Sequence, residues 1–136
     1  MTLEEMQARV RQGVPLAEAW RVEVLEAEAG RAVLRLPRDK LLLRPGGTVS
    51  GPALMGLADM AMWAALLSLS DGRDESLTAN LAITFLRPAG PGPVLAEARV
   101  IKRGRTLSYG EVLLRAEGAA EPAAHVTTSW AAARRG

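Results

Sequence analysis

Cysteine is absent from this sequence and histidine occurs once, as His125. The lack of cysteine excludes disulfides, thiolate metal ligands and a cysteine nucleophile. A single imidazole excludes metal sites and catalytic triads that need two, so we expect no metal and interpret His125 as structural. No Gly-x-Ser-x-Gly motif occurs, which makes serine-hydrolase chemistry of the nucleophile-elbow type unexpected.

Lysine is also scarce, since only Lys40 and Lys102 occur and the formal net charge of +2 comes almost entirely from arginine. Acidic residues nearly balance this charge, so nucleic-acid binding is not expected. The N-terminus lacks the basic-then-apolar pattern of a signal peptide, because Thr2 and Glu5 form a predicted capping box of a short amphipathic helix that ends near Gly13. We expect a cytoplasmic protein with one domain over residues 1–136, since no linker-like stretch divides the chain.

A long apolar stretch from Thr48 to Ser70 predicts the central element. Ser50 and Gly51 are suitable capping residues, and Pro52 stands in the first turn, where proline costs no hydrogen bond. Residues 53–69 are mostly strong helix formers that are apolar on nearly every face, which predicts a helix buried all round. The stretch reaches the lower length limit for a membrane span, but a carboxylate near its middle would be costly in lipid. We therefore predict a core helix and no membrane contact.

That carboxylate is Asp59, and no Lys, Arg or His lies within one helical turn of it. Charged groups inside proteins are paired, hydrogen-bonded or neutralised, so either a structural or a functional role fits Asp59 at this point. Met62 and Trp63 follow at i+3 and i+4 on the same helical face. They can line a pocket beside Asp59, although core packing is the simpler role.

The remaining chain alternates with the period of two that is typical of strands, and glycine and proline separate the segments. Predicted strands cover residues 20–28, 32–36, 77–86, 94–102, 106–114 and 125–130. Short local connections favour an antiparallel sheet. One sheet must curl around the thoroughly apolar helix to bury it, which predicts an α+β domain of the hot-dog type.

Several blocks of the sequence are informative in combination. Ser50-Gly51-Pro52 precedes Leu57-Ala58-Asp59, and Ile-Thr-Phe-Leu-Arg-Pro-Ala follows at residues 83–89, with a further block at residues 100–105. Together they resemble the hot-dog-fold thioesterases of the phenylacetate-pathway (PaaI-like) type, small enzymes that hydrolyse acyl-coenzyme A. The resemblance implies an acyl- or aryl-CoA substrate and no separate cofactor, since coenzyme A is part of the substrate.

The resemblance also implies roles for individual residues. Asp59 corresponds to the catalytic carboxylate, the Gly51 N–H to the group that polarises the thioester carbonyl, and Thr78 to a hydroxyl that helps to place water. Arg44 and Ser50 stand where the family usually has Asn and His, so groups that orient substrate and water are altered. A non-catalytic module that binds or senses acyl-CoA is therefore an alternative, and a hydratase acting on enoyl-CoA is a weaker one.

A basic segment near the end of the chain is a candidate for binding the coenzyme A phosphates. It comprises Lys102, Arg103, Gly104 and Arg105, where glycine leaves room for an anion. A solvated, arginine-rich surface explains the same residues equally well.

The spacing of the two central candidates predicts an assembly. Gly51 and Asp59 are eight residues apart on one helix, hence roughly 12 Å along its axis, too far to act on one carbonyl. If both serve the same thioester, a second subunit must supply one of them at a two-fold interface. We expect a homodimer as the minimal unit, and the family's tetramers imply a homotetramer.

Overall fold

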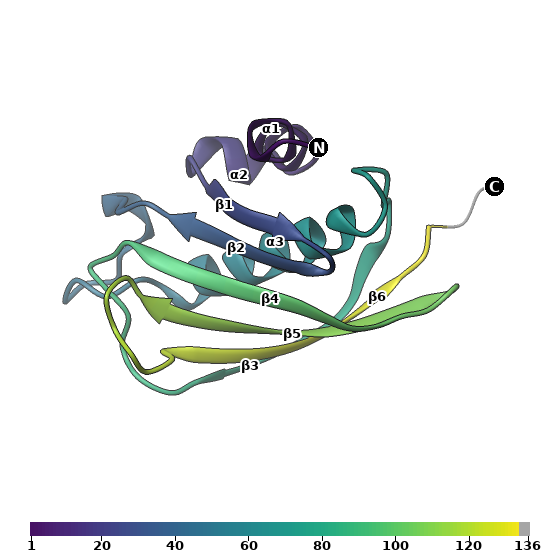
Figure 1. The fold of residues 1–136 in the computed structure, drawn as a ribbon. Coiled ribbons are helices and arrows are strands. Elements are labelled where there is room, and N and C mark those ends of the chain that lie inside the picture. Colours follow the sequence, from purple (N-terminus) through teal and green to yellow (C-terminus); the bar gives the residue numbers. More distant parts are fainter. Residues whose placement is uncertain (134–136) are drawn as a thin grey trace.

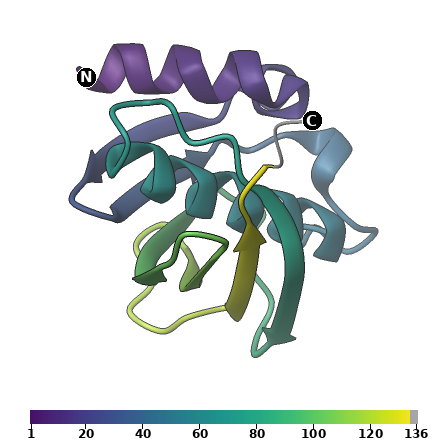
Figure 2. The same cartoon turned by 90° about the vertical axis from the view of Figure 1, so that its right-hand side faces the viewer.

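One antiparallel sheet and one long helix form the body of the structure, a computed structural model that describes residues 1–133 (Figure 1). The elements are α1 (Leu3–Gly13), α2 (Pro15–Ala19), β1 (Glu23–Glu28), β2 (Arg31–Leu36), the 3₁₀ turn η1 (Lys40–Leu42), α3 (Gly51–Ser68), β3 (Leu77–Phe85), β4 (Val94–Arg103), β5 (Leu107–Ala116) and β6 (Ala124–Ala131). The sheet curves around α3, and α1 lies across the fold beside β1 and α3 (Figure 2). The predicted α+β hot-dog arrangement is confirmed.

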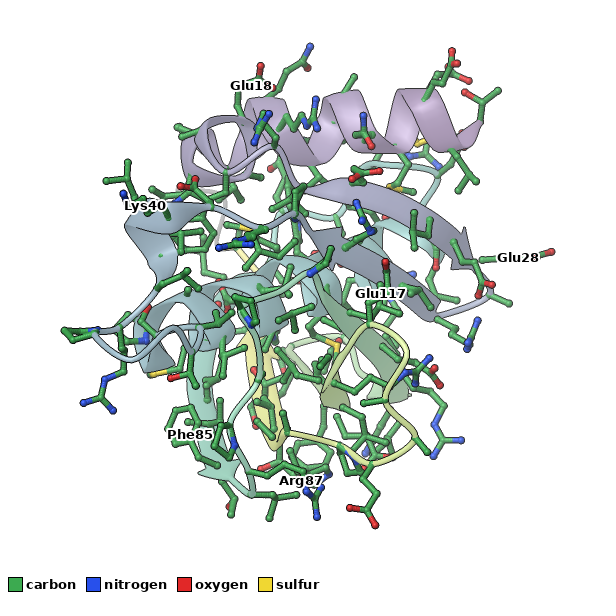
Figure 3. The ribbon with its side chains drawn as sticks, turned by 90° about the vertical axis from the view of Figure 1, so that its left-hand side faces the viewer. Glu18, Glu28, Lys40, Phe85, Arg87 and Glu117 are labelled. Carbon is green, nitrogen blue, oxygen red and sulfur yellow. The ribbon has the colours of Figure 1, made fainter. Side chains whose placement is uncertain are left out.

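The six strands lie in the order β1-β2-β4-β5-β6-β3, and each neighbouring pair is antiparallel. β3 pairs with β6, and no strand within residues 1–133 pairs with its other edge. Leu77 and Phe85 at the two ends of β3 are 69% and 53% exposed, and Figure 3 shows Phe85 at the outer edge of the molecule. A nine-residue edge strand with such apolar side chains is prone to pair with another chain.

α3 is the buried centre of the fold, as its composition predicts. The Ser50 side chain caps it by accepting a hydrogen bond from the Ala53 N–H at 3.4 Å. Twelve of its 18 residues are buried. The helix is long and apolar enough to cross a membrane, but 67% of it is buried inside the fold, which is typical of a core helix.

The predicted strands are all present, with bounds shifted by at most three residues, whereas two short helical elements are additional. Pro15 occupies the first turn of α2, where its missing N–H costs no hydrogen bond, so Gly13–Pro15 joins two helices. Asp39 caps η1 by accepting a hydrogen bond from the Leu41 N–H. Elements of three to five residues are too short for periodicity to reveal.

Candidate active site

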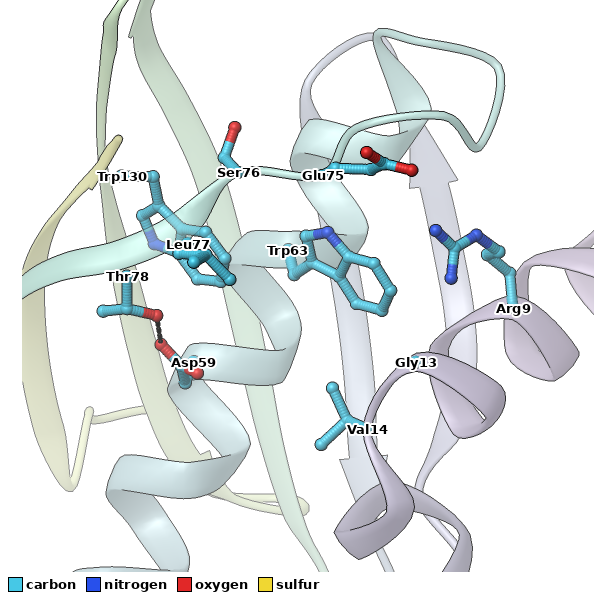
Figure 4. Close-up of a pocket in the computed structure, with 10 residues that line it drawn as sticks. All are labelled: Arg9, Gly13, Val14, Asp59, Trp63, Glu75, Ser76, Leu77, Thr78 and Trp130. Carbon is cyan, nitrogen blue, oxygen red and sulfur yellow. Dashed lines mark hydrogen bonds between the residues drawn. The ribbon is translucent and has the colours of Figure 1, made fainter. Parts of the chain in front are cut away.

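Asp59 and Thr78 form a hydrogen-bonded pair between α3 and the start of β3 (Figure 4). The Thr78 hydroxyl donates to Asp59 Oδ1 at 2.6 Å, a short distance typical of a hydroxyl bonded to a carboxylate. Asp59 is half-buried, and burial raises the pKa of its carboxyl group, while the Thr78 hydrogen bond lowers it. Partial desolvation makes a carboxylate a stronger proton acceptor than it is in water.

A cavity of about 310 Å³ opens beside this pair, with walls from α1, α3, β3 and β6. Trp63 and Trp130 form much of its apolar surface and are only 8% and 5% exposed. The Trp63 indole N–H donates to the Asp74 carbonyl at 3.1 Å, and that of Trp130 donates to the Thr128 hydroxyl at 3.1 Å. Since both N–H groups are satisfied elsewhere, the rings offer carbon surface to the cavity.

A second hollow of about 420 Å³ surrounds the start of α3 and includes Gly51, Arg44 and Phe85. The Gly51 N–H stands in the first turn, where a helix supplies no partner. A Cβ at Gly51 would lie 3.2 Å from Phe85 Cζ, so glycine admits the close approach of this ring. Asp59 borders the first cavity and Gly51 the second, so within one chain the two candidates face different spaces.

Met62 and Trp63 differ in position although both follow Asp59 by about one turn. Met62 is fully buried under β5, where a Cβ at Gly110 would collide with its thioether. Trp63 borders the cavity that contains Asp59. Of these two candidates, the structure brings only Trp63 together with Asp59, while Ser50 lies at the far end of the helix as its cap.

The backbone of the turn between β4 and β5 requires a glycine at position 104. The Gly104 N–H donates to the Leu107 carbonyl at 2.9 Å, and a Cβ at Gly104 would collide with that oxygen. Lys102 and Arg105 on either side are exposed.

Arg103, in the same segment, is tied into the fold. It donates to the Leu69 carbonyl at 3.0 Å and lies 3.7 Å from the buried carboxylate of Asp74. None of the four predicted phosphate-binding residues borders the cavity beside Asp59.

His125 pairs with Glu111 across neighbouring strands. Its Nε2 lies 3.2 Å from Glu111 Oε2, and Arg99 donates to Glu111 Oε1 at 3.0 Å. These two hydrogen bonds lower the pKa of Glu111. Within residues 1–133, no group of three His, Cys, Asp or Glu side chains is arranged to hold a metal ion.

Several cavity residues escape the sequence analysis, among them Arg9, Gly13 and Val14 from the α1 end of the cavity and Trp130 from β6. Arg9 lies over the Trp63 ring, with its guanidinium carbon 4.8 Å from the ring centroid. For Trp130 the sequence does contain a signal. It alternates with Val126 and Thr128 along the last strand, which indicates the inward-facing side, and these residues are buried in the structure. The α1 residues give no such signal, because their proximity to Asp59 arises only from tertiary packing.

Comparison with known families identifies the class. Residues 46–123 match the model of the thioesterase superfamily, so the chain belongs to this superfamily. A protein of Saccharolobus solfataricus named "putative esterase" is 34% identical over 91 residues, which is 67% of this chain and 64% of that relative. The chain thus matches less than two thirds of that relative's length.

Solved structures share the fold. A protein from Silicibacter sp. TM1040 described as a "putative thioesterase" has a TM-score of 0.86 and 30% identity, covering 98% of this chain and 93% of that one. A mutant of the phenylacetic acid degradation protein PaaI from Thermus thermophilus has a TM-score of 0.76 and 27% identity, covering 88% and 100% of the two chains.

Proposed function

We propose that this protein is a PaaI-like thioesterase that hydrolyses an acyl- or aryl-CoA. The observation that carries the proposal is the Asp59–Thr78 hydrogen bond beside a cavity whose walls include the rings of Trp63 and Trp130. The carboxylate is half-buried with a raised pKa, and it stands next to a space suited to an apolar acyl group. Membership in the thioesterase superfamily and the likeness to PaaI support the same chemistry.

Asp59 can act in two ways on a thioester. As a general base it accepts a proton from water, and the water oxygen attacks the carbonyl carbon. As a nucleophile its own oxygen attacks, and water then hydrolyses the mixed anhydride. Both routes break the carbon–sulfur bond and release a carboxylic acid and the coenzyme A thiol. The Thr78 hydroxyl engages Oδ1, which leaves Oδ2 for water or the carbonyl carbon.

The negative charge that develops on the carbonyl oxygen needs a donor. The Gly51 N–H at the start of α3 is suited to this role, because the first N–H groups of a helix are unpaired and carry partial positive charge. Arg44 borders the same hollow and contributes positive charge there. Within one chain this hollow is separate from the cavity of Asp59, so a complete site requires a second subunit.

The open edge of β3 offers a way to assemble that site. Thr78 stands near one end of β3, beside Asp59, and Phe85 at the other end contacts Gly51. Antiparallel pairing of β3 with a second copy, about a two-fold axis, would put Thr78 next to the partner's Phe85. Asp59 would then approach Gly51 of the partner subunit. We propose this homodimer as the minimal unit of a cytoplasmic homotetramer with one domain per chain.

Thiol release from a panel of acyl- and aryl-CoA thioesters tests the hydrolase assignment. We expect turnover by the wild-type protein and its loss in Asp59→Asn, which keeps the size of the side chain but cannot accept a proton. Full activity of Asp59→Asn would refute the role of Asp59. Thermal stabilisation by acyl-CoA without hydrolysis across the panel would instead favour the non-catalytic module.

Mixing two inactive variants tests the shared site. Asp59→Asn and Gly51→Val each damage a different half, so mixed dimers should regain one intact site and part of the activity. Phe85 is 53% exposed and can move aside for the valine, and light scattering should verify that both variants remain folded and oligomeric. A fully active monomer, or mixed dimers with no recovered activity, would contradict a site shared between subunits.

A further inference from the structure

The cavity beside Asp59 is bordered on one side by the end of the N-terminal helix. Asp59 and Thr78 lie on one side of it, Gly13 and Val14 on the other, and Trp63 between them (Figure 4). Its volume of about 310 Å³ is near the lower limit of pockets that bind small molecules. A group that enters this cavity from a carbonyl at Asp59 in the direction of α1 therefore meets Gly13 and Val14.

The Trp63 wall of this cavity is held from three directions. Its indole N–H donates to the Asp74 carbonyl, and the Arg9 guanidinium stacks over its ring. Arg9 is itself fixed, since its Nε donates to the Gly72 carbonyl at 3.0 Å. Gly13 touches the far edge of the ring so closely that a Cβ there would collide with it. These contacts hold the ring in place as one wall of the cavity.

α1 is fixed as firmly as Trp63. Met6 and Val10 on its inner face are buried in the core. The Val24 N–H of β1 donates to the Gln7 side chain at 3.0 Å, and Arg11 donates to the Val22 carbonyl at 3.1 Å. These contacts hold α1 against the core, with its C-terminal end at the cavity.

We propose that Val14, at the junction of α1 and α2, sets the length of the acyl group that this enzyme accepts. The inference rests on the proposed thioesterase function and names its substrate class, a short or compact apolar acyl group. Trp63 and Trp130 present carbon surface, which favours apolar groups, and Val14 stands across the cavity from Asp59, where a longer group would meet it. In an apolar pocket one methylene changes specificity by about 10- to 200-fold.

Substitutions at Val14 test the proposal in both directions. We would measure kcat/KM for straight-chain acyl-CoA thioesters from acetyl to octanoyl with the wild type, Val14→Ala and Val14→Phe. Val14→Phe should lower the ratio of hexanoyl-CoA to acetyl-CoA hydrolysis about tenfold or more, and Val14→Ala should raise it several-fold. Gln12→Phe is the matched control, because Gln12 is exposed, borders a different hollow and should leave the ratio unchanged.

A binding measurement separates this proposal from the assignment of hydrolysis. The same thioesters would be titrated calorimetrically into Asp59→Asn, with and without each Val14 substitution. The chain-length preference in binding should change with each Val14 substitution in the same direction as the preference in hydrolysis. Chain-length-dependent binding without turnover in the wild type would sink the hydrolase function and keep the role of Val14. If both Val14 variants keep the wild-type chain-length ratio in hydrolysis or in binding, the role of Val14 is refuted, while the hydrolase function still stands. The role of Val14 is also refuted if Gln12→Phe changes that ratio as much as Val14→Phe does.

Discussion

Replacing Thr78 with valine tests whether an ionised Asp59 is the active form. Valine keeps the β-branched shape that suits β3 but removes the hydroxyl that donates to Asp59 Oδ1 at 2.6 Å. A hydrogen bond to a charged group is worth about 1.5–3 kcal/mol, and we take the lower end because Asp59 is only half-buried. A loss of about 1.5 kcal/mol disfavours the ionised carboxylate roughly tenfold. The pKa of Asp59 should rise further, and the acid limb of the pH–rate profile should move to higher pH.

The assay is kcat/KM for one acyl-CoA thioester, measured across the acid limb for the wild type and the variants. Thr78→Ser keeps a hydroxyl at this position and should retain the wild-type limb. Thr84→Val makes the same change elsewhere on β3, opposite His125, and should also leave the limb in place. Coincident acid limbs for Thr78→Val and the wild type would refute the coupling between Thr78 and the ionisation of Asp59.

Two further outcomes concern stability and coenzyme A. Because burial raises the pKa of Asp59, the contribution of this group to stability is fully present below its ordinary pKa of 3.8 and is lost as pH rises through the raised value. Asp59→Asn should therefore have a higher Tm than the wild type at neutral pH, with the two values converging in acid, and a lower Tm at neutral pH would contradict this. Replacing the exposed Lys102 and Arg105 with alanine should raise KM several-fold for acyl-CoA, most at low salt, but not for N-acetylcysteamine thioesters, which lack the nucleotide phosphates. An equal rise in KM for both kinds of thioester would argue against phosphate binding there.

Local signals suffice to predict the fold. α3 is recognisable because it is apolar on nearly every face and begins with a capping serine, and the strands are recognisable by their alternation. These signals leave one arrangement, since a helix buried all round needs a sheet that curls around it. The capping box of α1 is equally local, and both of its hydrogen bonds are present.

The walls of the candidate site depend on tertiary contacts that no local pattern contains. Gly13 touches Trp63, which is far along the chain, and nothing in the sequence of α1 specifies that neighbour. Met62 and Trp63 are equivalent by helical spacing, but the missing side chain at Gly110 gives Met62 a place in the core. Gly104 fits an anion site by composition, whereas the Leu107 carbonyl that it contacts belongs to its own hairpin.

The edge strand β3 links catalysis to assembly in the proposed mechanism. Near its start Thr78 bonds to Asp59, and its last residue, Phe85, covers the helix start at Gly51. The same strand has apolar side chains exposed at both ends and an edge with no partner strand within residues 1–133. An isolated chain would thus hold a carboxylate without its oxyanion donor and an edge prone to pair. The proposed pairing of two copies of β3 would remove both deficiencies at once, because the same strand carries the open edge, Thr78 beside Asp59 and Phe85 beside Gly51.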